Sequence, residues 1–205
     1  EEEIHKIDPD IRVKAITAYV FESFLEKISR DFTKREGIMF VGGFGHPPNE
    51  DAVLWFAKEV YPLIEQKLKM PFYIVGSKPT EAVKALNSEN IIVKGFVSEE
   101  ELARLYNTCK IVVVPLRYGA GVKGKVVEAL YYGAPMVTTS VGIEGIKGVE
   151  DIIEVEETPE KFADAVVSLY TDNARLTKTV DTYQKFVKDH FSVDAVWNII
   201  RDDFS

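Results

Sequence analysis

One segment, residues 111–130, restricts the fold more than any other part of the chain. It opens with four consecutive β-branched residues, Ile111 to Val114, and no polar residue alternates with them. An uninterrupted apolar run of this length is typical of a central parallel strand that is covered on both faces. A loop with three glycines follows, and then a helix over 125–132. The segment therefore predicts a strand, a glycine-rich loop and a helix of an α/β fold.

The same alternation of strand and helix extends over most of the chain. Short apolar runs predict strands over 38–41, 72–75, 91–93, 111–114, 135–140 and 152–155. Asn49, Ser98 and Thr158 are predicted N-caps of helices between them, and Pro62 is expected to kink the first helix. About six strands separated by helices predict a Rossmann-like, doubly wound α/β domain with a parallel sheet. In such sheets, ligands bind outside the carboxyl ends of the strands.

The two ends of the chain depart from this pattern. Residues 12–20 predict a short strand, but 1–36 as a whole is expected to be a linker and the tail of a missing N-terminal domain. The chain opens without a methionine, which favours the hypothesis that it is a piece of a longer protein. The regular domain is expected over 37–190, and a C-terminal helix over 191–205.

Composition disfavours several classes of function. A net charge of −8 argues against a general nucleic-acid binder, which depends on many phosphate contacts from Lys and Arg. A single cysteine, Cys109, excludes an intramolecular disulfide, and the three histidines lack the spacing of metal ligands, so no metal or cofactor is expected. No apolar run approaches the roughly 18 residues of a membrane span. We therefore expect a cytoplasmic protein, either free or peripheral to the inner face of a membrane.

Glycine follows three of the predicted strands. Residues 42–45 follow the first strand, Gly76 and Ser77 follow the second, and 119–124 follow the fourth. Because the carboxyl ends of parallel strands meet at one edge, we expect these loops to line one crevice. Glycine is also common in such turns for backbone reasons alone, and for Gly76 both explanations stay open.

The third loop has the chemistry of an anion site. Three glycines and two lysines, Lys123 and Lys125, stand at a helix start, where free N–H groups attract negative charge. Residues 119–125 also match G-x-x-x-x-G-K, the beginning of a Walker A motif. However, Val126 replaces the magnesium-binding Ser or Thr, and the loop follows the fourth strand rather than an early one. A P-loop nucleotide hydrolase is therefore disfavoured.

Glu128 lies one turn into the same helix. Helical side chains lean toward the N-terminus, so its carboxylate is expected to point back at the loop, where it would suit hydroxyls such as those of a ribose. The simpler alternative is a weak surface pair with Lys125. His46, in a proline-bounded turn, could touch a ligand, but a solvated turn residue is the expected interpretation, and it receives no acid or base role.

Four stretches together resemble a known family. They are FVGGFGHPPNEDAVLWF at 40–56, YIVGS at 73–77, VKGFVSEEELARLY at 93–106 and VVPLRYGAGVKGKVVEALYYGAPMVTTSVGIEG at 113–145. The chain resembles the C-terminal half of a retaining glycosyltransferase of the two-Rossmann-domain (GT-B) type, in the group called glycosyl transferases group 1. The resemblance covers roughly residues 37 to 190.

The resemblance implies a site for a nucleotide-diphosphate (NDP) sugar, with the base and ribose held by this domain. Glu128 matches the second glutamate of the family's E-x7-E motif, which typically contacts the ribose. Ala120 occupies the position of the first glutamate, so the usual carboxylate for the sugar hydroxyls is missing. Backbone N–H groups of Gly121 and Val122 are its candidate replacements.

The resemblance also implies where the diphosphate charge is balanced. The family often places Arg and Lys after the first strand, but here that loop reads GFGHPPN. Lys123 and Lys125, together with Arg117, are expected to replace the family's Arg and Lys. The two lysines and Glu128 form the expected catalytic set, because negative charge develops on the departing diphosphate. No protein nucleophile is implied. The expected donor-binding residues are Gly43, Phe44, Gly76, Ser77, Phe96, Val97, Arg117, Gly119, Gly121, Val122, Lys123, Lys125 and Glu128, with Phe96 and Val97 beside the nucleobase.

These implications predict the donor-binding domain of a hexosyltransferase of polysaccharide biosynthesis. It would take a sugar from an NDP-sugar and pass it, with retention, to a glycan or lipid-linked acceptor held by the missing N-terminal domain; this domain alone would be inactive. Two alternatives stay open. A nucleotide-sugar epimerase of the same architecture would need paired acidic residues at the loop ends, and a non-catalytic nucleotide-sugar-binding module would be consistent with Ala120.

Overall fold

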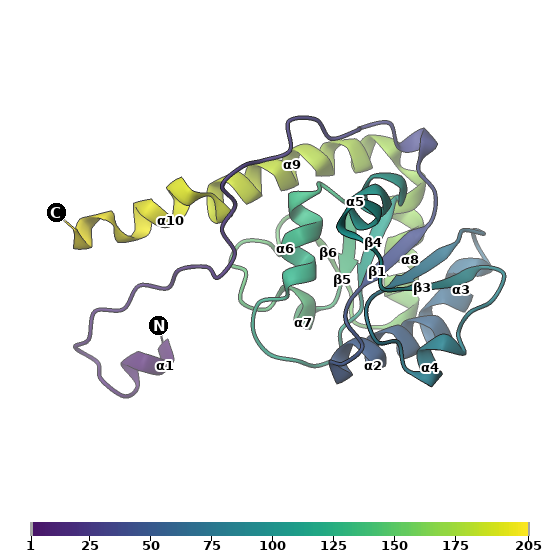
Figure 1. The fold of residues 1–205 in the computed structure, drawn as a ribbon, viewed down its shortest axis with the longest axis horizontal. Coiled ribbons are helices and arrows are strands. Elements are labelled where there is room, and N and C mark those ends of the chain that lie inside the picture. Colours follow the sequence, from purple (N-terminus) through teal and green to yellow (C-terminus); the bar gives the residue numbers. More distant parts are fainter. Residues whose placement is uncertain (1, 205) are drawn as a thin grey trace.

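A six-stranded parallel sheet lies at the centre of the computed structural model, which describes residues 2–204 (Figure 1). The strands are β1 Ile38–Val41, β2 Phe72–Val75, β3 Ile91–Gly95, β4 Ile111–Val114, β5 Met136–Thr138 and β6 Glu154–Val155. Their order is β3-β2-β1-β4-β5-β6, and every neighbouring pair is parallel. The predicted Rossmann-like, doubly wound fold is confirmed. Because the chain moves outward in one direction from β1 and in the other from β4, the loops after these two strands diverge and leave a crevice.

Strand β4 has the environment that its apolar run predicts. None of its four residues is more than 1% exposed, and Ile111 pairs in register with Ile38 of β1. On its other side, Val112 pairs with Met136 of β5. The strand is therefore central in the sheet, and the loop that follows it starts at the middle of the carboxyl edge.

Helices cover both faces of the sheet (Figure 1). They are α1 Glu2–His5, α2 Pro47–Trp55, α3 Tyr61–Glu65, α4 Glu81–Lys84, α5 Glu99–Thr108, α6 Gly124–Tyr131, α7 Ser140–Ile143, α8 Pro159–Thr171, α9 Asn173–Phe191 and α10 Val193–Ile200, with a π-helical segment η2 Phe56–Val60 and 3₁₀ turns η1 Phe32–Lys34 and η3 Arg201–Asp203. Phe162 of α8 packs against Trp55 and Phe56, with ring centres 6.1 and 5.7 Å apart. No helix among residues 2–204 is long and apolar enough to cross a bilayer.

The prediction of Asn49 as a helix N-cap is wrong. Helix α2 begins at Pro47, with His46 as the N-cap, so Asn49 lies inside the first turn. The helix starts earlier than predicted because of two prolines. Backbone N–H groups in the first turn have no acceptor within the helix, so proline loses no hydrogen bond there, and its fixed φ suits a helix. Asn49 is only 6% exposed, and its Nδ2 donates to the carbonyl oxygen of Gly43 at 2.7 Å.

The other predicted features of the helices are mostly confirmed. The hydroxyls of Ser98 and Thr158 cap α5 and α8 by accepting from the backbone N–H three residues later. The kink expected at Pro62 stays a prediction. Just before Pro62 the helix changes to the π-helical segment η2, and the N–H of its C-cap Tyr61 donates to the carbonyl oxygen of Phe56, five residues back. The segment between β5 and β6 contains the short helix α7.

The strand predicted over residues 12–20 is wrong, because this segment has no regular structure. A strand needs a neighbour for its backbone N–H and C=O groups, and only an isolated bridge between Phe21 and Ser192 forms nearby. The following residues pack along the domain: the Phe21 ring stacks on Tyr131 with centres 4.3 Å apart, and Ile28 and Phe32 are buried.

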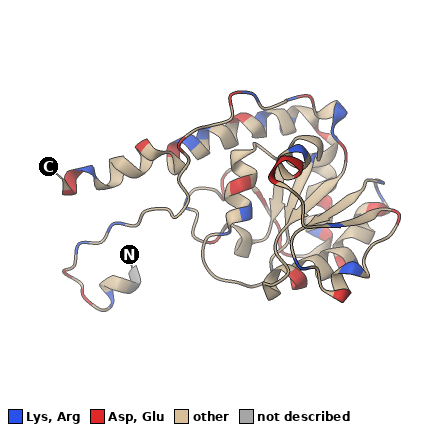
Figure 2. Ribbon diagram, in the orientation of Figure 1, with Lys and Arg blue, Asp and Glu red and all other residues tan. Residues whose placement is uncertain are grey.

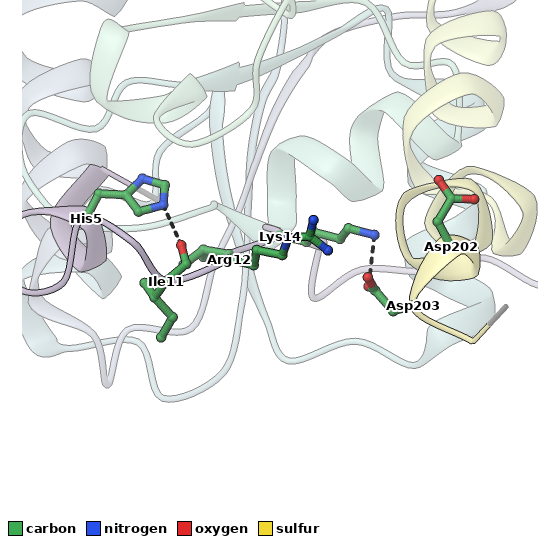
Figure 3. Close-up of a pocket in the computed structure, with 7 residues that line it drawn as sticks. His5, Ile11, Arg12, Lys14, Asp202 and Asp203 are labelled. Atoms are coloured by element: carbon green, nitrogen blue, oxygen red, sulfur yellow. Dashed lines mark hydrogen bonds and ion pairs between the residues drawn. The ribbon is translucent and has the colours of Figure 1, made fainter.

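The two ends of the described chain lie on the same side of the sheet domain (Figure 1). Lys14 forms an ion pair with Asp203 at 2.9 Å, and His5 bonds the carbonyl oxygen of Ile11 at 3.0 Å (Figure 3). Both pairs are at the surface, where such contacts contribute about 0–1 kcal/mol. The contact between the ends is therefore weak compared with the buried sheet.

Gly76 is required by packing. A Cβ atom at this position would lie 1.8 Å from the carbonyl oxygen of Gly42, which belongs to the loop after β1. The two loops approach each other so closely that no larger residue fits. The backbone explanation for Gly76 is thus sufficient, and a ligand contact remains only a prediction.

We expect Gly76→Ala to lower the free energy of unfolding by about 3 kcal/mol, since overpacking against fixed backbone forces the two loops apart. Gly45→Ala is the matched control, because the nearest atom to its Cβ would be Cδ of Lys78 at 4.0 Å. Urea denaturation of both variants measures the difference. Equal midpoints would contradict the close approach of the loops.

Candidate functional site

The glycine-rich loop leads from the central strand β4 to helix α6. Lys123 occupies the N-cap of α6, but no side chain caps this helix. By contrast, the side chains of Thr80, Ser98 and Thr158 cap α4, α5 and α8. The first N–H groups of α6 therefore have no capping side chain as an acceptor. A helix start of this kind attracts anions.

A hollow of about 190 Å³ lies in front of this helix start. It is lined by His46, Pro48, Asn49, Leu116, Ala120, Val122, Lys123, Gly124 and Lys125. These residues come from the loop after β1 with the start of α2, and from the loop after β4 with the start of α6. The two loops thus meet where the strand order changes direction, the place at which α/β sheets bind ligands.

Lys125 reaches from α6 toward the loop after β1. Its Nζ donates to Oδ1 of Asn49 and lies 4.5 Å from the centre of the Phe40 ring. A Cβ atom at Gly42 would be 2.8 Å from Nζ, so glycine at this position leaves room for the amine. Burial, and then the positive charge of Lys123, lower the pKa of Lys125 to about 7. An anion entering the hollow would therefore favour the protonated amine.

Lys123 is held inside the glycine-rich loop itself. Its Nζ donates to the carbonyl oxygen of Gly121 and forms an ion pair with Glu144 at 3.1 Å. The side chain is 10% exposed, whereas Glu144 is about half exposed. Lys123 thus stabilises the loop conformation and contributes positive charge to the hollow at the same time.

Glu128 turns toward α5 and is not among the residues that line the hollow, so the prediction that its carboxylate points back at the loop is wrong. Its Oε2 accepts from the hydroxyl of Tyr106 at 3.1 Å, and the Tyr106 ring stacks on Tyr132 at 4.5 Å. Burial raises the pKa of Glu128, and the hydrogen bond from Tyr106 opposes this rise. Among the described residues, Lys125 has no ion pair with Glu128, so the predicted alternative of a surface pair is wrong.

Other expected site residues lie apart from the hollow. Arg117 pairs with Asp51 of α2, with Nε 2.9 Å from Oδ2, and it does not line the hollow. Phe44 is buried and packs near Phe40, 6.2 Å between ring centres. Phe96 is 80% exposed after β3, at the edge of the sheet.

The remaining residues lie near the loop ends. Gly43 accepts a bond from Asn49, and a Cβ atom on Gly43 would lie 3.2 Å from the hydroxyl oxygen of Ser77. Val97 is half-buried and packs against the core. A Cβ atom on Gly119 would meet Pro48 and Lys123 at 3.7 Å, which places this glycine beside the hollow. The structure therefore gathers the two lysines with Gly43, Gly119 and Val122.

Sequence reasoning missed three residues that contact the expected ones: Asn49, Tyr106 and Glu144. Tyr106 and Glu144 stand in the stretches that carry the family resemblance, but neither has a motif of its own. Each meets its partner from another element of the fold, so no local spacing could reveal the contact. Along the described chain, Lys and Arg positions alternate with Asp and Glu positions on the helices (Figure 2).

Comparison with known proteins assigns the sheet domain to a family. The model of the family described as glycosyl transferases group 1 matches residues 35–172. A curated relative from Klebsiella pneumoniae, named as an uncharacterized 44.6 kDa protein in the cps region, is 26% identical over 176 residues. The match covers 80% of this chain but only 44% of that relative, so the chain spans less than half of its length.

Three solved structures share the fold. TarM from S. aureus, solved as a mutant with Fondaparinux, alpha-GlcNAc-glycerol and UDP, has a TM-score of 0.73 at 16% identity and covers 100% of this chain and 42% of its own. The C-terminal domain of LpcC, a glycosyl transferase group 1 family protein of Francisella tularensis, has a TM-score of 0.65 at 18% identity. The match covers 87% of this chain and 99% of the LpcC domain. HepE from Anabaena, in complex with UDP and glucose, has a TM-score of 0.61 at 14% identity. The match covers 85% of this chain and 49% of HepE.

The family model extends from just before β1 to the end of α8, and thus includes every strand of the sheet and both loops around the hollow. The LpcC domain matches this chain over nearly all of its own length, which agrees with a C-terminal GT-B half. This chain belongs to the glycosyl transferases group 1 family.

Proposed function

We propose that this chain is the donor-binding domain of a glycosyltransferase that takes a sugar from an NDP-sugar. The observation that carries the proposal is the uncapped start of α6, with Lys123 and Lys125 beside it, facing a hollow at the switch point of the sheet. A diphosphate carries the charge that such a site attracts. The UDP in the TarM and HepE complexes supports a nucleoside diphosphate as the ligand class.

The proposed roles follow from position. Lys125 and Lys123 balance the negative charge of the diphosphate, and the N–H groups of Gly121 and Val122 bind the donor in place of the carboxylate missing at Ala120. Glu128 accepts from the ribose hydroxyls, with Tyr106 holding its carboxylate in place. As the sugar leaves, negative charge grows on the diphosphate, and fixed positive groups stabilise that charge more than they stabilise the bound donor.

The wider activity is part of the same proposal. We infer a hexose-type sugar, transfer with retention and without a protein nucleophile, and a glycan or lipid-linked acceptor in polysaccharide biosynthesis. The acceptor would be held mainly by a second domain, because this chain covers less than half of its curated relative. We therefore expect this domain alone to bind donor without transferring the sugar. The whole protein would be cytoplasmic or peripheral to the inner face of a membrane.

One observation favours a second candidate, a non-catalytic nucleotide-sugar-binding module. Ala120 lines the hollow at the position where the family's E-x7-E motif has its first glutamate. Both candidates require donor binding, but only the enzyme requires the nucleoside diphosphate to be released from the donor. Turnover of a UDP- or GDP-sugar by the protein joined to its acceptor-binding half would exclude the module.

The double variant Lys123→Ala/Lys125→Ala tests the proposed function. We expect it to bind UDP or GDP at least tenfold more weakly, because each charge-assisted hydrogen bond contributes on the order of 1.5–3 kcal/mol. Isothermal titration calorimetry measures the affinity. The matched control is Lys67→Ala/Lys84→Ala, two exposed lysines paired with Asp164 and Glu81. Unchanged affinity in the first variant would refute the site.

A second variant separates the ribose from the diphosphate. Glu128→Gln should weaken the binding of UDP or GDP several-fold more than the binding of inorganic pyrophosphate, since only the nucleotide carries ribose hydroxyls. Glu81→Gln is the matched control, because Glu81 is an exposed carboxylate on α4 that pairs with Lys84. Calorimetric titrations with both ligands compare the losses. Equal losses for nucleotide and pyrophosphate would remove the proposed role of Glu128.

The buried amine of Lys125 also predicts how stability depends on pH. Below its folded pKa of about 7, the folded protein must hold a buried charge that the unfolded chain keeps in water. Between pH 7 and about 10, the unfolded state binds more protons, so stability rises with a slope of at most about 1.4 kcal/mol per pH unit. Urea unfolding of wild type and Lys125→Met across this range should show a difference with that sign. Parallel curves would contradict the burial of the amine.

A further inference from the structure

We propose that Asn49 is a positioning residue that holds the amine of Lys125 at the edge of the hollow, where it meets the diphosphate. The inference rests on the proposed function and adds to it a residue from the loop region after β1. Its basis is the hydrogen bond from Lys125 Nζ to Asn49 Oδ1, which connects α6 with α2 across the switch point.

The carboxamide of Asn49 can present only its oxygen to Lys125. Its Nδ2 donates to the carbonyl oxygen of Gly43 at 2.7 Å, and a carbonyl oxygen accepts only from an N–H or O–H group. Oδ1 therefore faces the other way, toward Nζ. The backbone just before Asn49 is also restricted, because Pro47 and Pro48 occupy the first two positions of α2. With 6% exposure, Asn49 has little freedom to rotate.

The amine of Lys125 has three identified neighbours. The Phe40 ring centre lies 4.5 Å away, a Cβ atom at Gly42 would lie 2.8 Å away, and Asn49 accepts a hydrogen bond. Lys125 is also among the residues that line the hollow. A protonated amine has three N–H groups. If one N–H group donates to Asn49 and another lies above the Phe40 ring, the third N–H group can donate to a phosphate oxygen.

A neutral partner suits this position better than a carboxylate. An aspartate would pair with Lys125, repel an incoming phosphate and cancel the charge the site needs. The acidic groups of the neighbouring elements have other partners: Glu50 accepts from Thr80, Asp51 pairs with Arg117, Glu128 accepts from Tyr106 and Glu144 pairs with Lys123. Among the described residues, no carboxylate is paired with Lys125, and the other titratable groups lining the hollow are Lys123 and His46.

A double-mutant cycle tests the inference. Inorganic pyrophosphate and UDP are titrated into wild type, Asn49→Ala, Lys125→Ala and the variant with both changes at pH 7.5. We expect Asn49→Ala to bind both ligands about three- to tenfold more weakly in the wild-type background. In the Lys125→Ala background the same change should have no further effect, because Asn49 acts through the amine. Additive losses would overturn the inference.

A second variant does not depend on the fold tolerating alanine at a buried position. Asn49→Asp has nearly the same shape, and its carboxylate should keep Lys125 protonated. Titrations in two buffers of different ionisation enthalpy measure how many protons pyrophosphate binding takes up. Above pH 7, wild type should take up more protons than Asn49→Asp. Equal uptake in wild type and Asn49→Asp would overturn the inference.

The outcomes also separate this inference from the proposed function. If wild type binds neither UDP nor pyrophosphate, or if Lys125→Ala binds them as tightly as wild type does, the diphosphate site itself is wrong and both proposals fail. If wild type binds and Lys125→Ala weakens binding, but the losses from Asn49→Ala are additive, only the role of Asn49 fails. Thermal unfolding of each variant confirms that the measured differences belong to folded protein.

Discussion

The parallel pairing of β1 with β4 is the contact on which the candidate site depends. Ile38 and Met39 pair in register with Ile111 and Val112, and all four side chains are almost fully buried. This pairing places two strands that are far apart in the chain beside each other at the switch point. The loops that follow them then share one edge, so that Asn49 from one side and Lys125 from the other can meet.

The site contains the amine of Lys125 at a buried position where a hydrophobic side chain would make the folded protein more stable. Burying a charge costs free energy that neither an amide oxygen nor an aromatic ring fully returns, and the pKa of Lys125, near 7, reflects this cost. The surroundings limit the cost without neutralising the charge: Gly42 leaves space, and Asn49 accepts a hydrogen bond. An anion in the hollow would supply the missing counter-charge. A destabilising feature of this kind is typical of binding sites.

Several features could be predicted from the sequence because they depend on neighbouring residues. The apolar run at 111–114, the hydroxyl caps at Ser98 and Thr158, and the alternation of strands and helices all appear in the structure. Two predictions failed for different reasons. The strand over 12–20 is absent because no other strand pairs with it, which depends on the tertiary structure. Asn49 lies inside the helix for a local reason, because the two prolines just before it occupy the first helical positions.

The sequence by itself determined the fold class, the family and the presence of a lysine-bearing glycine loop before a helix, since each is encoded in residues close together in the chain. Only the tertiary structure decided which side chains meet. Arg117 pairs with Asp51 outside the hollow, Glu128 accepts from Tyr106, and Lys125 donates to Asn49, 76 residues earlier. These contacts join different elements, and their geometry exists only after the parallel sheet has brought the ends of distant strands to one edge.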